Sequence, residues 1–171
     1  MVEYRAEVTQ HNSEELIFID ETGAVLNMTP RYARCPAGER AYAPKPTAKG
    51  RRISTIGALT TTGFLSAFCF EGTLNGDVFL YYVEHFLLPH LTPGKGVILD
   101  NAAAHQDEEA LELIEQTGAI VLFLPPYCPE LNPIEYSWSK IKNFLKKQAA
   151  RTKEQLYQAL SEALKIIDLY G

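Results

Sequence analysis

The sequence has few cysteines, no long apolar run and no sign of a leader segment. Its cysteines, Cys35, Cys69 and Cys128, are odd in number and form no CxxC pair, which argues against a disulfide framework or a zinc site. No apolar run approaches the ~18 residues that a membrane span needs. The first ten residues contain acids and no apolar stretch, unlike a signal peptide. We therefore expect a cytoplasmic protein with no membrane partner.

Positive charge is concentrated in two segments, although the net charge of −5 speaks mildly against a nucleic-acid partner. Residues 31–52 carry seven Arg and Lys against Glu39 alone, and residues 140–153 carry six with no acid. A chain of this kind can offer basic surfaces to phosphate while it stays acidic overall. Two ordinary solvated faces would explain the same pattern, so charge alone leaves both interpretations open.

Short apolar runs alternate with amphipathic segments, which predicts one α/β domain over residues 1–171. An apolar run at 16–20 is followed by a predicted turn at 21–23, and prolines and glycines predict a loop at 34–50. The remaining expected elements are a hairpin at 52–60 and 64–70, strands at 96–99 and 119–124, and helices at 75–91, 107–117, 132–148 and 152–170. This order predicts a mixed sheet with helices on its faces.

Two predicted strands end in an aspartate, Asp20 and Asp100. In open α/β sheets the ligand crevice lies beyond the carboxyl ends of the parallel strands. If the two strands are neighbours, both carboxylates project at one edge, where a divalent cation would neutralise them. Oxygen-only ligands suit magnesium or manganese. The competing interpretation is that each aspartate only starts a turn or caps a helix. Glu21 follows Asp20 directly and would point to the other face, so we favour Asp20.

A third acid, Glu135, falls at the predicted start of a helix. Asn132 is expected to be the N-cap and Pro133 the first helical residue, which puts Glu135 at the third position. A glutamate there can close a capping box on the backbone of Asn132. Alternatively, if the strand at 119–124 lies beside the Asp100 strand, this helix start brings Glu135 toward the same crevice.

Three motifs resemble those of mariner-type insertion-sequence transposases of the DDE superfamily. They are Ile19-Asp20-Glu21, then Leu99-Asp100-Asn101 with His105, and then Leu124-Pro-Pro-Tyr-Cys-Pro-Glu-Leu-Asn-Pro-Ile-Glu135 with Trp138. The 34 residues between Asp100 and Glu135 match the short second spacing of this group. The third motif is highly specific, whereas the first alone would be weak.

The resemblance implies an RNase H-like five-stranded mixed sheet with helices on both faces. It implies that Asp20, Asp100 and Glu135 hold two Mg²⁺ ions, which Mn²⁺ can replace, with Asp20 bridging both. Two ions can activate the attacking oxygen and stabilise the leaving oxygen in displacement at a DNA phosphate. The expected function is cleavage of transposon ends and strand transfer, with double-stranded DNA as partner at the nucleoid. A homodimer is expected because two element ends must be held together.

Other residues near these motifs are weaker candidates. Side chains that would support the acids or contact DNA are Asn101, His105, Tyr127, Lys140 and Lys142. His105 could orient a phosphate or Asp100, or simply pack at a helix start, and we favour such a structural or supporting role over direct metal ligation. The lysines can equally be solvated and Tyr127 can pack in its turn. Trp138 is expected to pack its helix against the sheet.

Three alternatives stay open. Another RNase H-like nuclease is disfavoured by the Asn-Pro-Ile-Glu motif, and a non-catalytic DNA-binding or regulatory relative by the three intact acids. An aspartyl-phosphate phosphatase would need an aspartate at position 22, where this chain has threonine.

The transposase family usually carries helix-turn-helix segments before the catalytic part, whereas 15 residues precede the first predicted strand here. We therefore expect either a catalytic fragment or one part of a transposase that is encoded in two pieces, and we do not assign recognition of terminal repeats to this chain.

Overall fold

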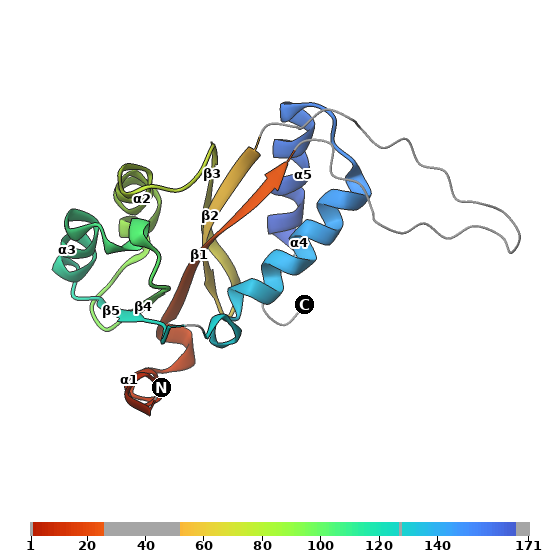
Figure 1. Cartoon of the computed structure of the whole chain (residues 1–171). Helices are drawn as coiled ribbons and strands as arrows, with labels where there is room; N and C mark the ends of the chain where they lie inside the picture. The colour runs from red at the N-terminus through yellow and green to blue at the C-terminus, as the bar shows by residue number, and fades with distance from the viewer. Residues whose placement is uncertain (1, 26–51, 127, 167–171) are drawn as a thin grey trace, which may run out of the picture.

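The structure is a computed structural model that describes residues 2–25, 52–126 and 128–166 (Figure 1). The predicted loop at 34–50, nearly all of the basic segment at 31–52, and Tyr127 lie outside the described residues. No helix in the described ranges is long and apolar enough to cross a membrane.

Five strands form one mixed sheet in the order β3-β2-β1-β4-β5. Their bounds are β1 (Leu16–Val25), β2 (Arg52–Thr60), β3 (Gly63–Glu71), β4 (Gly96–Leu99) and β5 (Ile120–Phe123). The pairs β1–β2 and β2–β3 are antiparallel, whereas β1–β4 and β4–β5 are parallel. Parallel neighbours need long crossovers, which the helical segments between β3 and β5 supply. The predicted mixed five-stranded sheet is confirmed.

Helices cover both faces of this sheet, as predicted. They are α1 (Val2–Thr9), α2 (Gly76–Tyr82), α3 (Glu108–Gln116), α4 (Ile134–Gln148) and α5 (Lys153–Ile166). The α2 segment continues as a π-helical turn at Val83–Leu87 and a 3₁₀ turn at Leu88–His90, so the helix predicted at 75–91 is less regular than expected. Short 3₁₀ turns lie at Ser13–Glu15, Ala103–Gln106 and Pro129–Leu131. Helix α1 was not expected from the sequence.

The predicted turn at residues 21–23 is wrong. Strand β1 continues to Val25, and its residues 18–25 pair without interruption with β2. Glu-Thr-Gly has the composition of a turn, but antiparallel pairing with a distant strand satisfies its backbone groups and outweighs the local preference. Asp20 therefore lies in the middle of β1 rather than at its end.

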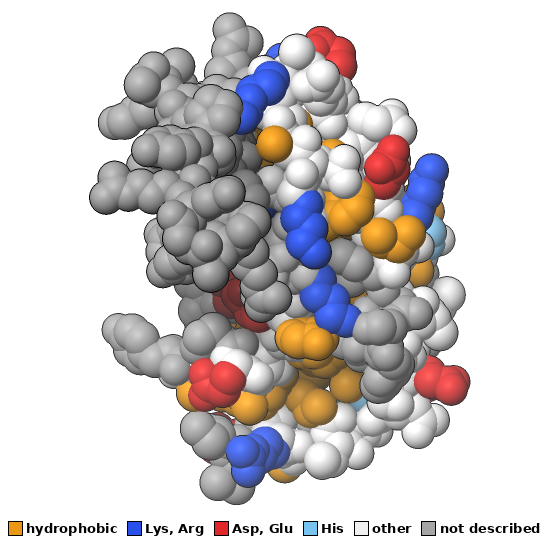
Figure 2. Space-filling view, turned by 90° about the vertical axis from the view of Figure 1, so that its right-hand side faces the viewer, with side chains coloured by type: hydrophobic (Ala, Val, Ile, Leu, Met, Phe, Trp, Pro, Cys, Tyr) orange, Lys and Arg blue, Asp and Glu red, His pale blue; other side chains and the backbone are white. Residues whose placement is uncertain are grey.

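Helices α4 and α5 cover one face over β1, β2 and β3, and Figure 2 views the molecule from that side. Buried apolar residues of β1 and β2 pack there against the inner sides of both helices, including Ala24, Ile53, Trp138, Ile141 and Leu160. On the same face a separate cluster of Tyr4, Leu16, Ile98, Leu122 and Leu124 lies under α1. Phe18 packs against both clusters.

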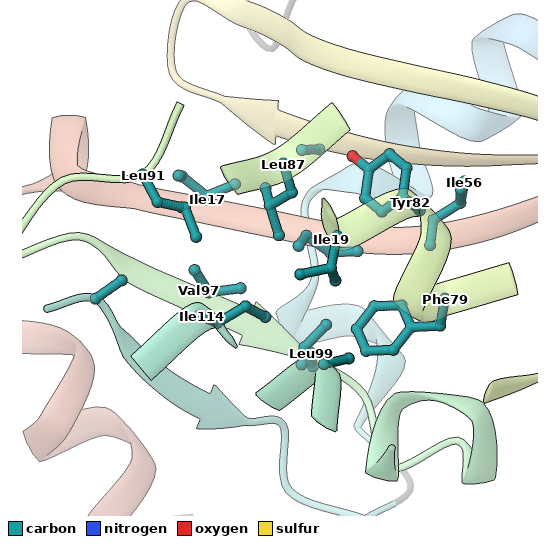
Figure 3. Close-up of a cluster of buried hydrophobic side chains, with 14 residues drawn as sticks. Ile17, Ile19, Ile56, Phe79, Tyr82, Leu87, Leu91, Val97, Leu99 and Ile114 are labelled. Carbon is teal, nitrogen blue, oxygen red and sulfur yellow. The ribbon is translucent and has the colours of Figure 1, made fainter. Parts of the chain in front are cut away.

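The opposite face is covered by α2, α3 and the π-helical turn. Figure 3 shows the side chains of β1, β2 and β4 pointing toward those of the helices in one continuous apolar cluster. Ile19, Ile56, Leu99, Phe79 and Ile114 in this cluster are fully buried. Because side chains alternate along a strand, the residues after Ile19 and Leu99 point to the α4 face. Those residues are Asp20 and Asp100.

Candidate active site

Asp20 and Asp100 lie side by side on neighbouring parallel strands. The β1–β4 register pairs Leu16 with Gly96 and Phe18 with Ile98, and its continuation sets Asp20 beside Asp100. Strand β4 ends at Leu99, so Asp100 is the first residue beyond it. The predicted adjacency of Asp20 and Asp100 is confirmed. Only β4 ends here, whereas β1 continues to Val25.

Helix α4 brings Glu135 to the same place. It begins at Ile134, one residue later than predicted, and the Asn132 side chain accepts a hydrogen bond from the Ile134 N–H at 3.3 Å. Glu135 lies in the first turn, and its carboxyl group is close enough to that of Asp20 to help raise the pKa of Asp20. Since α4 packs on β1 and β5 lies beside β4, the route predicted for Glu135 toward the crevice is confirmed.

Asp20 is an unfavourably placed carboxylate. Its side chain is 7% exposed. Burial, together with the nearby carboxyl groups of Glu135 and Asp100, raises the pKa of Asp20 to about 8, although the Glu21 backbone N–H opposes this effect. The three carboxyl groups thus bring together more negative charge than the surrounding residues stabilise. The raised pKa means that Asp20 keeps a proton at neutral pH, and a bound cation would offset the same negative charge.

Asp100 is held by a different set of contacts. Its Oδ1 accepts hydrogen bonds from Nδ1 of His105 at 2.5 Å and from the Ala102 N–H at 2.9 Å. The His105 hydrogen bond is the main reason why the pKa of Asp100 lies below its ordinary value, against the opposing effect of burial. The imidazole of His105 is 1% exposed, packs on Phe79, and its Nε2 has no hydrogen-bond partner among the described residues. His105 therefore fixes the orientation of Asp100 from beneath.

The other side chains considered from the sequence have surroundings of their own, outside the group of three acids. Asn101 donates from Nδ2 to the backbone carbonyl of Leu124, which ties the segment after β4 to the end of β5. The Glu21 carboxylate does not join the site but lies 3.6 Å from the Arg52 guanidinium. On α4, Nζ of Lys140 lies 4.6 Å from the Tyr136 ring centroid, and Lys142 is half-buried.

The donor chemistry of this cluster suits a hard divalent cation. Asp20, Asp100 and Glu135 offer only carboxylate oxygens, the ligands that magnesium and manganese prefer. As arranged, however, no group of three His, Cys, Asp or Glu side chains in the described part of the chain could hold a metal ion. Cation binding would therefore need these side chains to move from the positions they have here.

One residue that the sequence analysis missed is Gly57. It is the cross-strand partner of Asp20 on β2. A Cβ at this position would lie 2.9 Å from Cη2 of Trp138, so the indole of α4 sits directly against the glycine backbone. The signal was present in the sequence, since a glycine inside a strand pattern often marks a close approach.

Comparison with known proteins assigns a family to this fold and site. A sequence profile described as "DDE superfamily endonuclease" matches residues 15–157, which include all three acids. A comparison with curated protein sequences gave no match.

Solved structures of Mos1 transposase have the same fold. The Mos1 paired-end complex with the left transposon end is 16% identical with a TM-score of 0.76, and covers 98% of this chain and 52% of its own. The mariner Mos1 paired-end complex with Mg is 17% identical with a TM-score of 0.77, at 98% and 53% coverage. The Mos1 catalytic domain alone is 14% identical with a TM-score of 0.71, at 98% and 78% coverage. The chain thus spans about half the length of the transposase chains in those complexes.

At these identities the structures establish the fold, which is the predicted RNase H-like one, while the profile covers most of the sequence. The chain belongs to the DDE superfamily endonuclease family.

Proposed function

We propose that this chain is the catalytic domain of a DNA transposase that cleaves transposon ends and joins them to target DNA. The observation that carries the proposal is the meeting of Asp20, Asp100 and Glu135, from three separate segments, on one face of the sheet. The similar Mos1 structures include complexes with a transposon end and a strand-transfer complex, which supports the reaction class.

Magnesium is the proposed metal, bound as two ions by the three acids, with manganese as a substitute. Mos1 structures have been solved with Mg and with Mn. When bound, such ions stabilise both the attacking and the leaving oxygens of an in-line displacement at phosphorus. Asp20 is the proposed shared ligand because both of the other acids act on it and its charge is unfavourable in the metal-free protein.

The residues of the chain hold the acids in position, and they shield Asp20 from water, whereas Asp100 and Glu135 are reached by solvent. Burial of Asp20 places its carboxylate where electrostatic interactions are stronger than in water. His105 holds Asp100 in one orientation, and Asn101 ties the Asp100 segment to β5. These contacts prepare the acids before DNA arrives, as phosphoryl transfer requires.

DNA is proposed to run along α4 past Lys142 and Lys146. Figure 2 shows Lys and Arg side chains gathered on the side that α4 and α5 form. At 3.6 residues per turn and ~1.5 Å per residue, Lys142 and Lys146 lie on the same stripe of α4 as Glu135, roughly 10 and 16 Å further along the axis. Both are half-buried, so their stems pack on the surface beside the site. Two cations in line with the acids suit successive phosphates of one strand.

Lys140 is a weaker DNA candidate on this geometry, although the sequence singled it out. It lies about 140° around the helix from Glu135. Its ammonium group is over the ring of Tyr136, which is 61% exposed. Lys147 lies on the same side of α4 as Lys140, so these two lysines together provide the control for Lys142 and Lys146. Tyr127 stays a candidate outside the described residues.

A homodimer, a single domain over residues 1–171 and action at the nucleoid remain predictions of the same proposal. Dimerisation would bring two element ends together, and the nucleoid is where the proposed substrate lies.

The direct test is a cleavage assay on DNA that carries the element ends, with Mn²⁺ or Mg²⁺, and with any recognition segment supplied in trans. We expect metal-dependent nicking by the native chain and none by Asp100→Asn, with unchanged circular dichroism. A folded protein that binds DNA but never cuts or joins it would instead be a regulatory relative. Cutting of RNA–DNA hybrids or junctions in preference to element ends would identify another RNase H-like nuclease.

A further inference from the structure

We infer that Gly57 and Trp138 set the depth at which α4 docks on the sheet, and thereby the separation of the Asp20 and Glu135 carboxylates. Gly57 is in this view a positioning residue of the site, acting through Trp138. The inference rests on the proposed function only for the identity of the ligand, a divalent cation held by the acids.

The first support is the position of Gly57. It is directly opposite Asp20 in the β1–β2 register, so both residues belong to the same face of the sheet. It is buried in the middle of β2, where glycine costs stability relative to residues that favour strands. A glycine at this unfavourable position indicates that the space above it is needed.

The second support is what fills that space. The position of a Cβ on Gly57 is 2.9 Å from Cη2 of Trp138 and 3.1 Å from Cε1 of Phe64. Trp138 is 2% exposed, and its ring centroid lies 5.2 Å from that of Phe64. The indole N–H has no hydrogen-bond partner in the described part of the chain, so packing alone holds the ring. Trp138 therefore rests on the sheet at Gly57 and acts as a spacer between β2 and α4.

The third support is the short link from Trp138 to Glu135. The two residues are three apart in α4, which is about one turn. Carbon atoms in contact prefer about 3.5–4.0 Å, so an added methyl group on residue 57 would push the indole outward by roughly 0.5–1 Å. Metal ligands tolerate deviations of only about 0.2 Å. If α4 moves with its tryptophan, the shift at Glu135 exceeds that tolerance several-fold.

The test compares Gly57→Ala with Gly96→Ala as matched control. Gly96 is also buried in the sheet, but a methyl group there would meet the tip of the flexible Leu16 side chain at 3.0 Å and the His11 ring at an ordinary contact distance of 3.7 Å. Mn²⁺ affinity is measured by calorimetry at a temperature where circular dichroism shows each variant folded. We expect Gly57→Ala to weaken Mn²⁺ binding about tenfold or more and the control to bind like the native chain.

Removing the spacer should remove most of the effect of Gly57→Ala on Mn²⁺ affinity. Phenylalanine lacks the outer part of the indole that carries Cη2, so in a Trp138→Phe background Gly57→Ala should have little further effect on Mn²⁺ affinity. Native Mn²⁺ affinity in Gly57→Ala, at lowered thermal stability, would overturn the inference, since the ring would then have tilted without moving α4. If Gly57→Ala does not fold, Trp138→Phe is tested alone and should weaken Mn²⁺ binding. Unchanged Mn²⁺ affinity in a folded Trp138→Phe variant would contradict the inference.

A metal-free measurement separates this inference from the proposed function. The coupling free energy between Asp20→Asn and Glu135→Gln, from urea unfolding, reports how close the two carboxyls lie. We expect it to shrink toward zero in the Gly57→Ala background and to persist in Gly96→Ala. A native chain that binds no Mn²⁺ would contradict the proposed function, whereas an undiminished coupling in Gly57→Ala would contradict the role of Gly57.

Discussion

The two faces of the sheet are built from the same strands but have opposite chemistry. Under α2 and α3, Ile19 and Leu99 are fully buried in a continuous apolar cluster. Under α4, the next residue of each strand is an acid, and Asp20 carries a raised pKa of about 8. Buried polar atoms of Thr22, Ser137 and Trp138 on this second face also have no hydrogen-bond partner among the described residues.

This difference shows how one fold tolerates an unfavourable site. Hydrophobic burial on the α2–α3 face supplies stability, while the α4 face keeps charge that costs stability and is useful only when a cation arrives. Alternation of side chains along β1 and β4 separates the two roles by a single residue. Substitutions one residue apart should therefore have opposite consequences.

The largest effects should come from comparing Asp20→Asn with Ile19→Ala. We expect Asp20→Asn to abolish metal-dependent DNA cutting while the melting temperature stays level or rises, because folding at neutral pH no longer has to keep a buried carboxyl group protonated. Ile19→Ala should lower the free energy of unfolding by about 2–5 kcal/mol. It should retain cutting at temperatures where it is folded. Cutting assays and urea denaturation check both, and equal loss of stability in the two variants would remove the contrast between the faces.

A smaller effect is expected at His105, which touches both faces. Its ring packs on Phe79 of the apolar cluster and its Nδ1 holds Asp100. His105→Ala should weaken Mn²⁺ binding by roughly 10–100-fold, since Asp100 loses its orienting partner. His105→Asn, whose amide can still donate to Asp100, should recover part of that affinity in calorimetry. Full affinity in the alanine variant would show that Asp100 needs no support.

The next effect concerns the outer surface of α4. The paired variant Lys142→Ala with Lys146→Ala should weaken DNA binding and reduce the salt slope of log K by about 2. The matched pair Lys140→Ala with Lys147→Ala removes the same charge from the other side of the helix and should change the slope less. Equal slopes in a fluorescence anisotropy titration would place the DNA elsewhere.

A separate effect is the pH dependence of the metal-free protein. The pKa of Asp20 is about 8 in the folded protein against an ordinary value of 3.8. Its contribution to stability is therefore fully present below about pH 4 and is lost as pH rises toward 8. The melting temperature should fall over this range, and Asp20→Asn should flatten the decline. If the melting temperature falls with the same slope in the native protein and in Asp20→Asn, a titrating group other than Asp20 causes the fall. Asp100, with its lowered pKa, acts in the opposite sense only at more acid pH.

Local patterns in the sequence predicted most of the fold and the identity of the three acids. Apolar runs before Asp20 and Asp100 predicted buried strands, and the Asn132–Pro133 pair predicted the start of α4 to within one residue. The turn predicted at Glu21–Gly23 was wrong because the continuation of β1 depends on pairing with β2, and 26 residues separate the two strands in the sequence. The Gly57–Trp138 contact and the approach of Glu135 to Asp20 depend on how α4 docks, which no local pattern encodes.

We propose that Asp20, Asp100 and Glu135 form one divalent-metal site on the α4 face. Anomalous diffraction from a crystal soaked in Mn²⁺ tests this proposal directly. Manganese peaks are expected among these three carboxylates. Well-ordered acids with no peak between them, or peaks only at other residues, would contradict it.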